Sequence, residues 1–82
     1  MNQATRGMLK EFRESQGLSI RQFTDVLNEQ LPPGRGTYFM AIHNWEAGHA
    51  DIPFYLWFYL AHRGSGAVRE FAERLVKVMS NA

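Results

Sequence analysis

Glycine and proline divide this chain into short segments, and each segment carries apolar residues at helical spacing. The breaks fall at Gly17, Pro32-Pro33, Gly48 and Gly64. Glycine ends a helix by adopting the left-handed conformation, and proline cannot continue a helix. No segment alternates apolar and polar residues over the length of a strand. The sequence therefore predicts short helices and gives no support to a β-sheet.

Five helices are expected, and polar residues stand where four of them would begin. Ser19 and Gln22 have the spacing of a capping box, in which each side chain bonds the backbone of the other. Thr37, Asp51 and Ser65 are the expected N-caps of the last three helices. The 82 residues are enough for one domain, so residues 1–82 are expected to form one all-α, compact five-helix bundle. Its helices lie at about residues 3–16, 19–31, 37–47, 52–63 and 66–79.

Composition excludes several classes of protein. Cysteine is absent, so there is neither a disulfide framework nor a thiolate zinc site. The longest apolar stretch, residues 52–61, is too short for a membrane span, and the N-terminus shows no targeting pattern. These features indicate a cytoplasmic protein that does not contact a membrane. The histidines His43, His49 and His62 lack the spacing of a helical metal pair, so no metal site is expected.

An enzyme is not expected either, and no cofactor is implied. A core of this size leaves little room for a buried catalytic pocket, and the spacing of Ser, His and Asp suggests no triad. Nine basic and eight acidic residues give a net charge of +1. Any surface that binds nucleic acid must therefore be local, with the acids placed elsewhere.

Two stretches of the sequence resemble the Cro/C1-type helix-turn-helix domains of phage repressors and bacterial regulators. The first matches the opening of these domains and reads Leu9-Lys10-Glu11-Phe12-Arg13-Glu14-Ser15-Gln16-Gly17-Leu18-Ser19. The second reads Ile42-His43-Asn44-Trp45-Glu46-Ala47-Gly48 and is followed by Pro53. The resemblance covers residues 8–62 and implies a lambda-repressor-like fold. It also implies that the protein acts in the cytoplasm of a bacterial or phage-infected cell.

The resemblance also implies specific packing. It places Trp45 in the core between the first and third helices and pairs Glu46 with Arg13. Phe12, Leu18, Phe23, Leu27 and Ile42 would share that core. One departure from the family is the connection between the second and third helices, which is longer here, from Asn28 to Gly36.

The implied function is sequence-specific binding of double-stranded DNA by a transcriptional regulator, with the third helix in the major groove. Asn44 can bond adenine bidentately, whereas Phe39 and Met40 offer only apolar contact. Arg35 lies between two glycines, and a loop of this kind can approach a phosphate closely. The predicted DNA-binding residues are Arg21, Gln22, Arg35, Thr37, Tyr38, Phe39, Met40, His43 and Asn44.

The fourth predicted helix carries more aromatic residues than one buried face can hold. Leu56, Leu60 and either Trp57 or Tyr59 can pack inward. Tyr55, Phe58 and His62 would then lie on another face, and an exposed aromatic stripe indicates an interface. A homodimer contact is one interpretation, and a core closed by the fifth helix is another.

A second function class stays open beside DNA binding. The net charge is close to neutral and the expected base-reading positions are partly apolar. The same fold could therefore serve as a protein-interaction module that binds a partner through its aromatic fourth helix, with DNA binding weak or lost.

Overall fold

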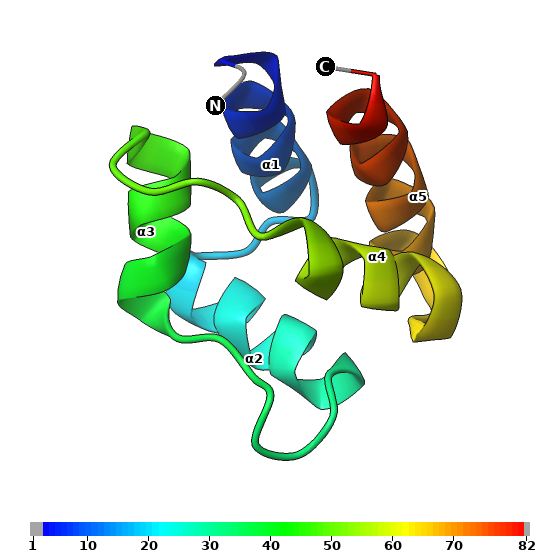
Figure 1. Ribbon diagram of the computed structural model, residues 1–82. Helices are drawn as coiled ribbons and strands as arrows, with labels where there is room; N and C mark the ends of the chain where they lie inside the picture. Colours follow the sequence, from blue (N-terminus) through cyan, green and yellow to red (C-terminus); the bar gives the residue numbers. More distant parts are fainter. Residues whose placement is uncertain (1–2, 82) are drawn as a thin grey trace.

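The breaks predicted at glycine and proline separate helices in the computed structural model of the chain, which describes residues 3–81 (Figure 1). The five helices are α1 (Gln3–Ser15), α2 (Ile20–Gln30), α3 (Phe39–Ala47), α4 (Phe54–Arg63) and α5 (Gly66–Ser80). Residues 3–81 contain no strand. The prediction of an all-α fold with five helices is therefore confirmed.

Two of the helices end in the same glycine-dependent turn. At the end of α1, Gly17 has a φ of 69° and its N–H donates to the Glu14 carbonyl at 3.0 Å. The next N–H, that of Leu18, donates to the Arg13 carbonyl at 3.2 Å. Gly48 has a φ of 83° and ends α3 with the equivalent pair of bonds. These two bonds satisfy carbonyls that the helix leaves open, and glycine adopts the required backbone without a Cβ clash.

The capping prediction is confirmed for α2 only. Ser19 Oγ accepts from the Gln22 N–H at 3.1 Å, and Gln22 Oε1 accepts from the Ser19 N–H at 2.9 Å. The prediction for α3 was wrong, because the helix begins at Phe39 and Tyr38, not Thr37, occupies its N-cap position.

The start of α4 also differs from the sequence prediction, whereas α5 begins at the expected residue, directly after Ser65. Helix α4 begins at Phe54 with Pro53 as its N-cap, so neither Asp51 as a cap nor Pro53 in the first turn was correct. Ser65 does precede α5, but its side chain makes no capping bond. An X-Pro step favours extended backbone before the proline, which keeps residues 51 and 52 outside the helix.

Aromatic rings from four helices meet in the core. Phe12 of α1 stacks on Phe71 of α5 with ring centroids 4.3 Å apart. Phe71 in turn meets the edge of Trp57 from α4 at 5.6 Å, and Phe23 of α2 lies 6.0 Å from Phe12. All four rings are buried. The sequence left open whether Trp57 or Tyr59 packs inward from α4, and Trp57 is the fully buried ring while Tyr59 is half-buried. Because Trp57 packs on Phe71, α5 covers part of the aromatic run within the chain.

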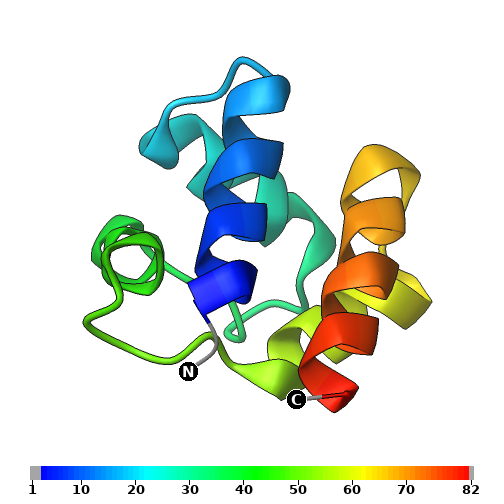
Figure 2. The ribbon, with the colours of Figure 1, turned by 90° about the horizontal axis from the view of Figure 1, so that it is seen from above.

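The aromatic core lies on one side of α1, and α3 lies on the opposite side of α1. Seen from above, α1 lies between α3 and α5, while α4 crosses beneath α5 (Figure 2). The ends of α1 and α5 that carry the chain termini lie on the same side of the molecule (Figures 1 and 2). Helix α3 therefore packs on its inner side and leaves its outer side uncovered.

An ion pair joins α1 to α3, as the resemblance implied. Arg13 Nε and Nη2 donate to the two carboxylate oxygens of Glu46 at 2.8 and 3.0 Å, and Nη1 donates to the Leu18 carbonyl at 2.9 Å. The hydrogen bonds to Glu46 raise the pKa of Arg13 above its ordinary value. Beside the pair, Trp45 is buried as predicted, whereas Leu18 is only half-buried against the core.

Candidate nucleic-acid interface

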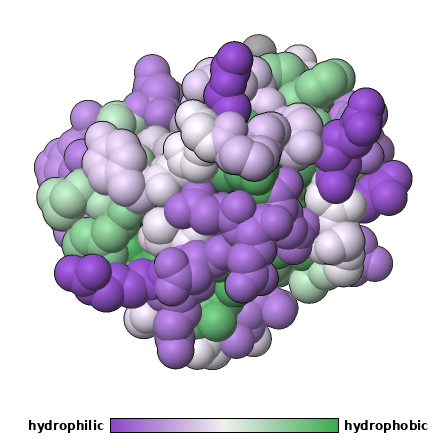
Figure 3. Space-filling model, turned by 90° about the horizontal axis from the view of Figure 1, so that it is seen from below, coloured by the Kyte–Doolittle hydropathy of each residue, from purple (hydrophilic) through white to green (hydrophobic). Residues whose placement is uncertain are grey.

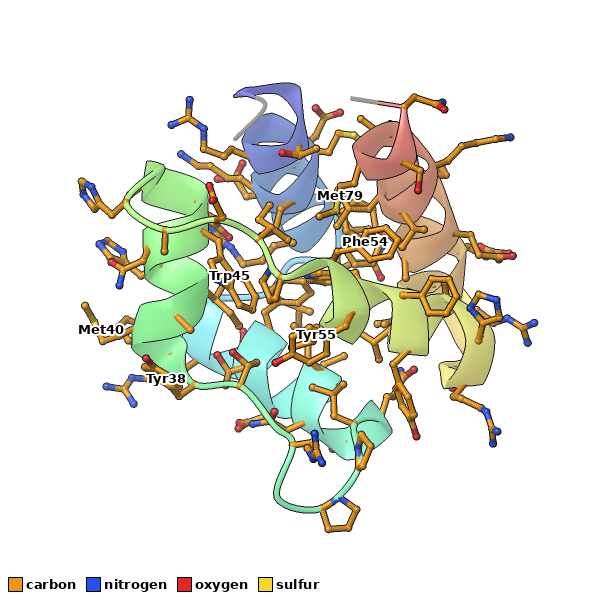
Figure 4. All side chains as sticks on the ribbon, viewed as in Figure 1. Tyr38, Met40, Trp45, Phe54, Tyr55 and Met79 are labelled. Atoms are coloured by element: carbon orange, nitrogen blue, oxygen red, sulfur yellow. The ribbon has the colours of Figure 1, made fainter. Side chains whose placement is uncertain are left out.

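Helix α3 has one buried face and one exposed face. Ile42 and Trp45 point into the core, and Figure 4 shows Trp45 directed inward while Tyr38 and Met40 point away from the bundle. The exposed fraction is 66% for Tyr38 and 49% for Met40. Helical spacing places Phe39 with His43, and Met40 with Asn44, one turn apart. His43 is exposed and Asn44 is half-buried, so this outward face carries five of the residues predicted to read DNA.

The start of α2 meets the start of α3 through a cation and a ring. The Arg21 guanidinium lies 4.8 Å from the centroid of the Phe39 ring, and Phe39 lies nearly parallel to His43 at 6.5 Å. Arg21 and Gln22 are exposed, although the Gln22 side chain is occupied by the capping box. The structure therefore brings Arg21 to the outward face of α3. Gln22 is the next residue, but its side chain is used to cap α2.

The long connection of residues 31–38 is held in shape by one side chain. Asn28 Nδ2 donates to the Thr37 carbonyl at 2.9 Å, and Asn28 Oδ1 accepts from the Thr37 N–H at 2.7 Å. Gly36 packs so closely on the Asn28 amide that a Cβ at this position would collide with it. The backbone of Thr37 therefore anchors the segment that leads into α3. This role differs from the helix cap that the sequence predicted for its side chain.

Arg35 lies at a different place from Arg21. It lines a groove of about 680 Å³ between the connection and α4. The groove has an apolar floor of Leu31, Pro32 and Leu56, and its rings come from Tyr55, Phe58 and Tyr59. We call this feature the aromatic groove. The structure therefore does not bring Arg35 together with the exposed face of α3 through any recorded contact among the described residues.

The three residues predicted to form a dimer contact do lie together. Tyr55 and Phe58 are exposed to 73% and 45%, and His62 is exposed on the next turn. His62 Nδ1 lies 2.9 Å from the Phe58 carbonyl, and the two rings are 4.3 Å apart. All three line the aromatic groove.

Sequence reasoning missed one basic residue of this groove. Arg63 follows His62 at the end of α4 and lines the groove together with Arg35. Helical spacing would have placed Arg63 one turn after Tyr59, but nothing in the sequence indicated that the connection folds back against this helix. The groove therefore combines three rings with three basic side chains.

Viewed from below, hydrophilic side chains cover much of the centre of the molecule, and apolar side chains emerge at the left and at the upper right (Figure 3). Across residues 3–81 no group of three or more His, Cys, Asp or Glu side chains could hold a metal ion. Within the same residues, no helix is long and apolar enough to cross a membrane.

Comparisons with protein-family models, with curated proteins and with solved structures give no significant match to this chain. The two motifs and the geometry of α1, α2 and α3 are thus the basis for any functional assignment.

Proposed function

We propose that this chain is a sequence-specific double-stranded DNA-binding protein that regulates transcription as a repressor, with α2 and α3 forming a helix-turn-helix of the Cro/C1 type. The observation that carries the proposal is the outward face of α3. One side of this helix is fixed in the core by Ile42 and Trp45, and the other side is free to enter a groove. The major groove of DNA accepts a helix of this kind.

The second support comes from the ion pair between α1 and α3. The resemblance implied that Arg13 and Glu46 would meet, and they are 33 residues apart in the chain. A bidentate pair needs both partners in one plane, so an unrelated helical arrangement would not produce it by spacing alone. The pair between α1 and α3 therefore supports the helix-turn-helix proposal.

The proposed mechanism divides the contacts between bases and phosphates. Asn44 would bond adenine in the major groove, and Met40 and Phe39 would contact thymine methyl groups. Arg21 would neutralise a phosphate at the edge of the same groove while its guanidinium stays over the Phe39 ring. Arg35 is a second phosphate candidate in this proposal, on the connection that leads into α3.

The test begins with a selection of bound duplexes from random DNA, followed by affinity measurements over a salt series. We expect Arg21→Gln to reduce the slope of log affinity against log salt by about one unit, because one fewer counterion is released. Arg35→Gln should do the same if the connection reaches the backbone. Arg69→Gln on α5 is the matched control, since Arg69 is an exposed cation outside the proposed interface.

Base reading needs a separate variant. Asn44→Ala should lower the preference for the selected sequence by roughly tenfold while leaving the salt slope unchanged, because a bidentate base contact is worth about 1–3 kcal/mol and releases no counterion. Failure to select any sequence, or selection that is the same for wild type and Asn44→Ala, would refute the proposed reading by α3.

A protein-interaction module on the same fold is the second candidate function. The specific observation is the exposure of Tyr38 and Met40 on the outward face of α3, because large apolar side chains that face water are typical of protein interfaces. Tyr38→Ala with Met40→Ala separates the two candidates. The pair of substitutions should weaken a protein contact strongly but should leave the salt dependence of DNA binding intact.

A further inference from the structure

The aromatic groove carries three basic side chains, and two of them are guanidinium groups without a recorded partner among residues 3–81. Arg35 enters it from the connection, and His62 and Arg63 enter it from the last turn of α4. Within residues 3–81 the structure records no hydrogen bond or ion pair for the guanidinium of Arg35 or of Arg63. No aspartate or glutamate is among the described residues that line the groove. The groove is therefore positively charged and lies open to an anion.

The size and lining of the groove suit a small molecule. Its volume of about 680 Å³ falls in the range of ligand pockets, about 300–1,000 Å³. Tyr55, Phe58 and Tyr59 offer ring faces and edges at its wall. Planar rings pack on such surfaces in offset or edge-on geometry, and guanidinium groups bind a carboxylate through two parallel hydrogen bonds.

We infer that the aromatic groove binds a small aromatic acid, with the ring against Tyr55 and Phe58 and the carboxylate at Arg63 and Arg35. His62 is fixed beside this position by its ring contact with Phe58 and by Nδ1, which donates to the Phe58 carbonyl. This inference goes beyond the proposed DNA binding. Arg63, Phe58 and Tyr55 are not among the residues of the outward face of α3, and Arg35 is the one residue that both proposals use.

Charge decides between this occupant and a second copy of the chain. A twofold contact places one patch against the same patch of the partner. The unpaired guanidiniums of Arg35 and Arg63 would then approach their own counterparts, and like charges repel in a contact that excludes water. An anionic ligand instead supplies the charge that the groove lacks.

The experiment uses the full chain, labelled with ¹⁵N, and titrates 2-naphthoate while amide resonances are followed by NMR. The neutral isostere 2-naphthamide is titrated in parallel. We expect naphthoate to shift resonances of residues 31–35 and of α4, and to bind at least about tenfold more tightly than the amide, because a charge-assisted pair is stronger than a neutral one.

Arg63→Gln should remove most of this difference between the acid and the amide, and Arg35→Gln should reduce it. Arg69→Gln, in the first turn of α5 and outside the lining of the groove, is the matched control and should bind as the wild type does. Circular dichroism of each variant checks that the helices are intact.

Three results would overturn the inference. The first is that naphthoate shifts no resonance of the groove. The second is equal binding of acid and amide, which would indicate an apolar surface without anion recognition. The third is a shift of the groove resonances with protein concentration before any ligand is added, which would indicate a second copy in the groove. DNA binding is measured separately through Asn44 and Arg21, so failure of one proposal does not imply failure of the other.

Discussion

At the scale of single residues, the contact between Arg13 and Glu46 shows how one pair of side chains can fix two helices. The exposed fractions of the two side chains are 12% and 7%, so water screens the pair poorly. Arg13 also bonds the Leu18 carbonyl, just beyond the turn that ends α1. Loss of either partner would leave the other charge buried without compensation, which is costly.

The first residue-scale prediction is that Arg13→Ala and Glu46→Ala each lower the free energy of unfolding by about 3 kcal/mol. The double variant should cost clearly less than the sum, because the second substitution removes the charge that the first one stranded. Urea unfolding followed by circular dichroism measures all three. Arg69→Ala, an exposed arginine of α5, is the control and should stay within about 0.5 kcal/mol of wild type. Strict additivity would mean that the two side chains do not interact in solution.

The pH dependence of this pair follows from the direction of its pKa shift. The bond to Glu46 raises the pKa of Arg13 in the folded chain. A group with a raised pKa gives its full stabilisation at pH values below its unfolded pKa and loses it as the pH rises through the folded value. The Arg13 contribution to stability should therefore stay constant from neutral pH up to the alkaline range in which arginine begins to titrate, as unfolding of wild type and Arg13→Ala at two pH values would show.

At the scale of elements, two helices end in similar turns but in different surroundings. Gly17 and Gly48 both have positive φ, and the space beside Gly17 is open. At Gly48 the Arg6 guanidinium from α1 occupies the position that a Cβ would take. The end of α3 therefore depends on glycine twice, once for its backbone and once for the packing of α1.

The element-scale prediction compares alanine at the two positions. Gly17→Ala should cost about 1–2 kcal/mol, the penalty for a left-handed residue with a side chain. Gly48→Ala should cost more, because Arg6 must also move. In an Arg6→Ala background, Gly48→Ala should cost about as much as Gly17→Ala does, because only the backbone penalty remains. Thermal unfolding of the set provides the numbers, and equal costs at Gly17 and Gly48 would contradict the packing of Arg6.

At the scale of the whole molecule, the question is what covers the aromatic groove. The residues predicted from sequence to form a homodimer, Tyr55, Phe58 and His62, line the same surface as the unpaired guanidiniums. The homodimer stays a prediction, and it competes with the aromatic acid for one site. The two proposals require opposite behaviour of the free protein.

Sedimentation at increasing concentration distinguishes them. We expect the wild type to sediment as a monomer, because a twofold contact would oppose arginine to arginine. Phe58→Glu should also be monomeric and folded, since the Phe58 ring is 45% exposed and contributes little to the core. A wild-type dimer that dissociates in Phe58→Glu would establish the homodimer and refute the aromatic acid as the occupant of the groove.

The sequence alone determined the elements that depend on local chemistry. Gly17 and Gly48 end helices because only the residue itself has to adopt the left-handed backbone, and Ser19 with Gln22 caps α2 because both partners lie within one turn. The motifs also placed Trp45 in the core and joined Arg13 to Glu46, because the resemblance supplied the long-range contact that spacing could not.

Only the tertiary structure decided the features that depend on how distant segments meet. Thr37 lost the predicted capping role because Asn28, nine residues earlier, binds its backbone and delays the start of α3. Arg35 lines the aromatic groove together with Arg63 because the connection folds against α4. Side-chain periodicity reports which face of a helix is buried, but it contains no information about which other segment will cover that face, because that choice is made by packing of the whole chain.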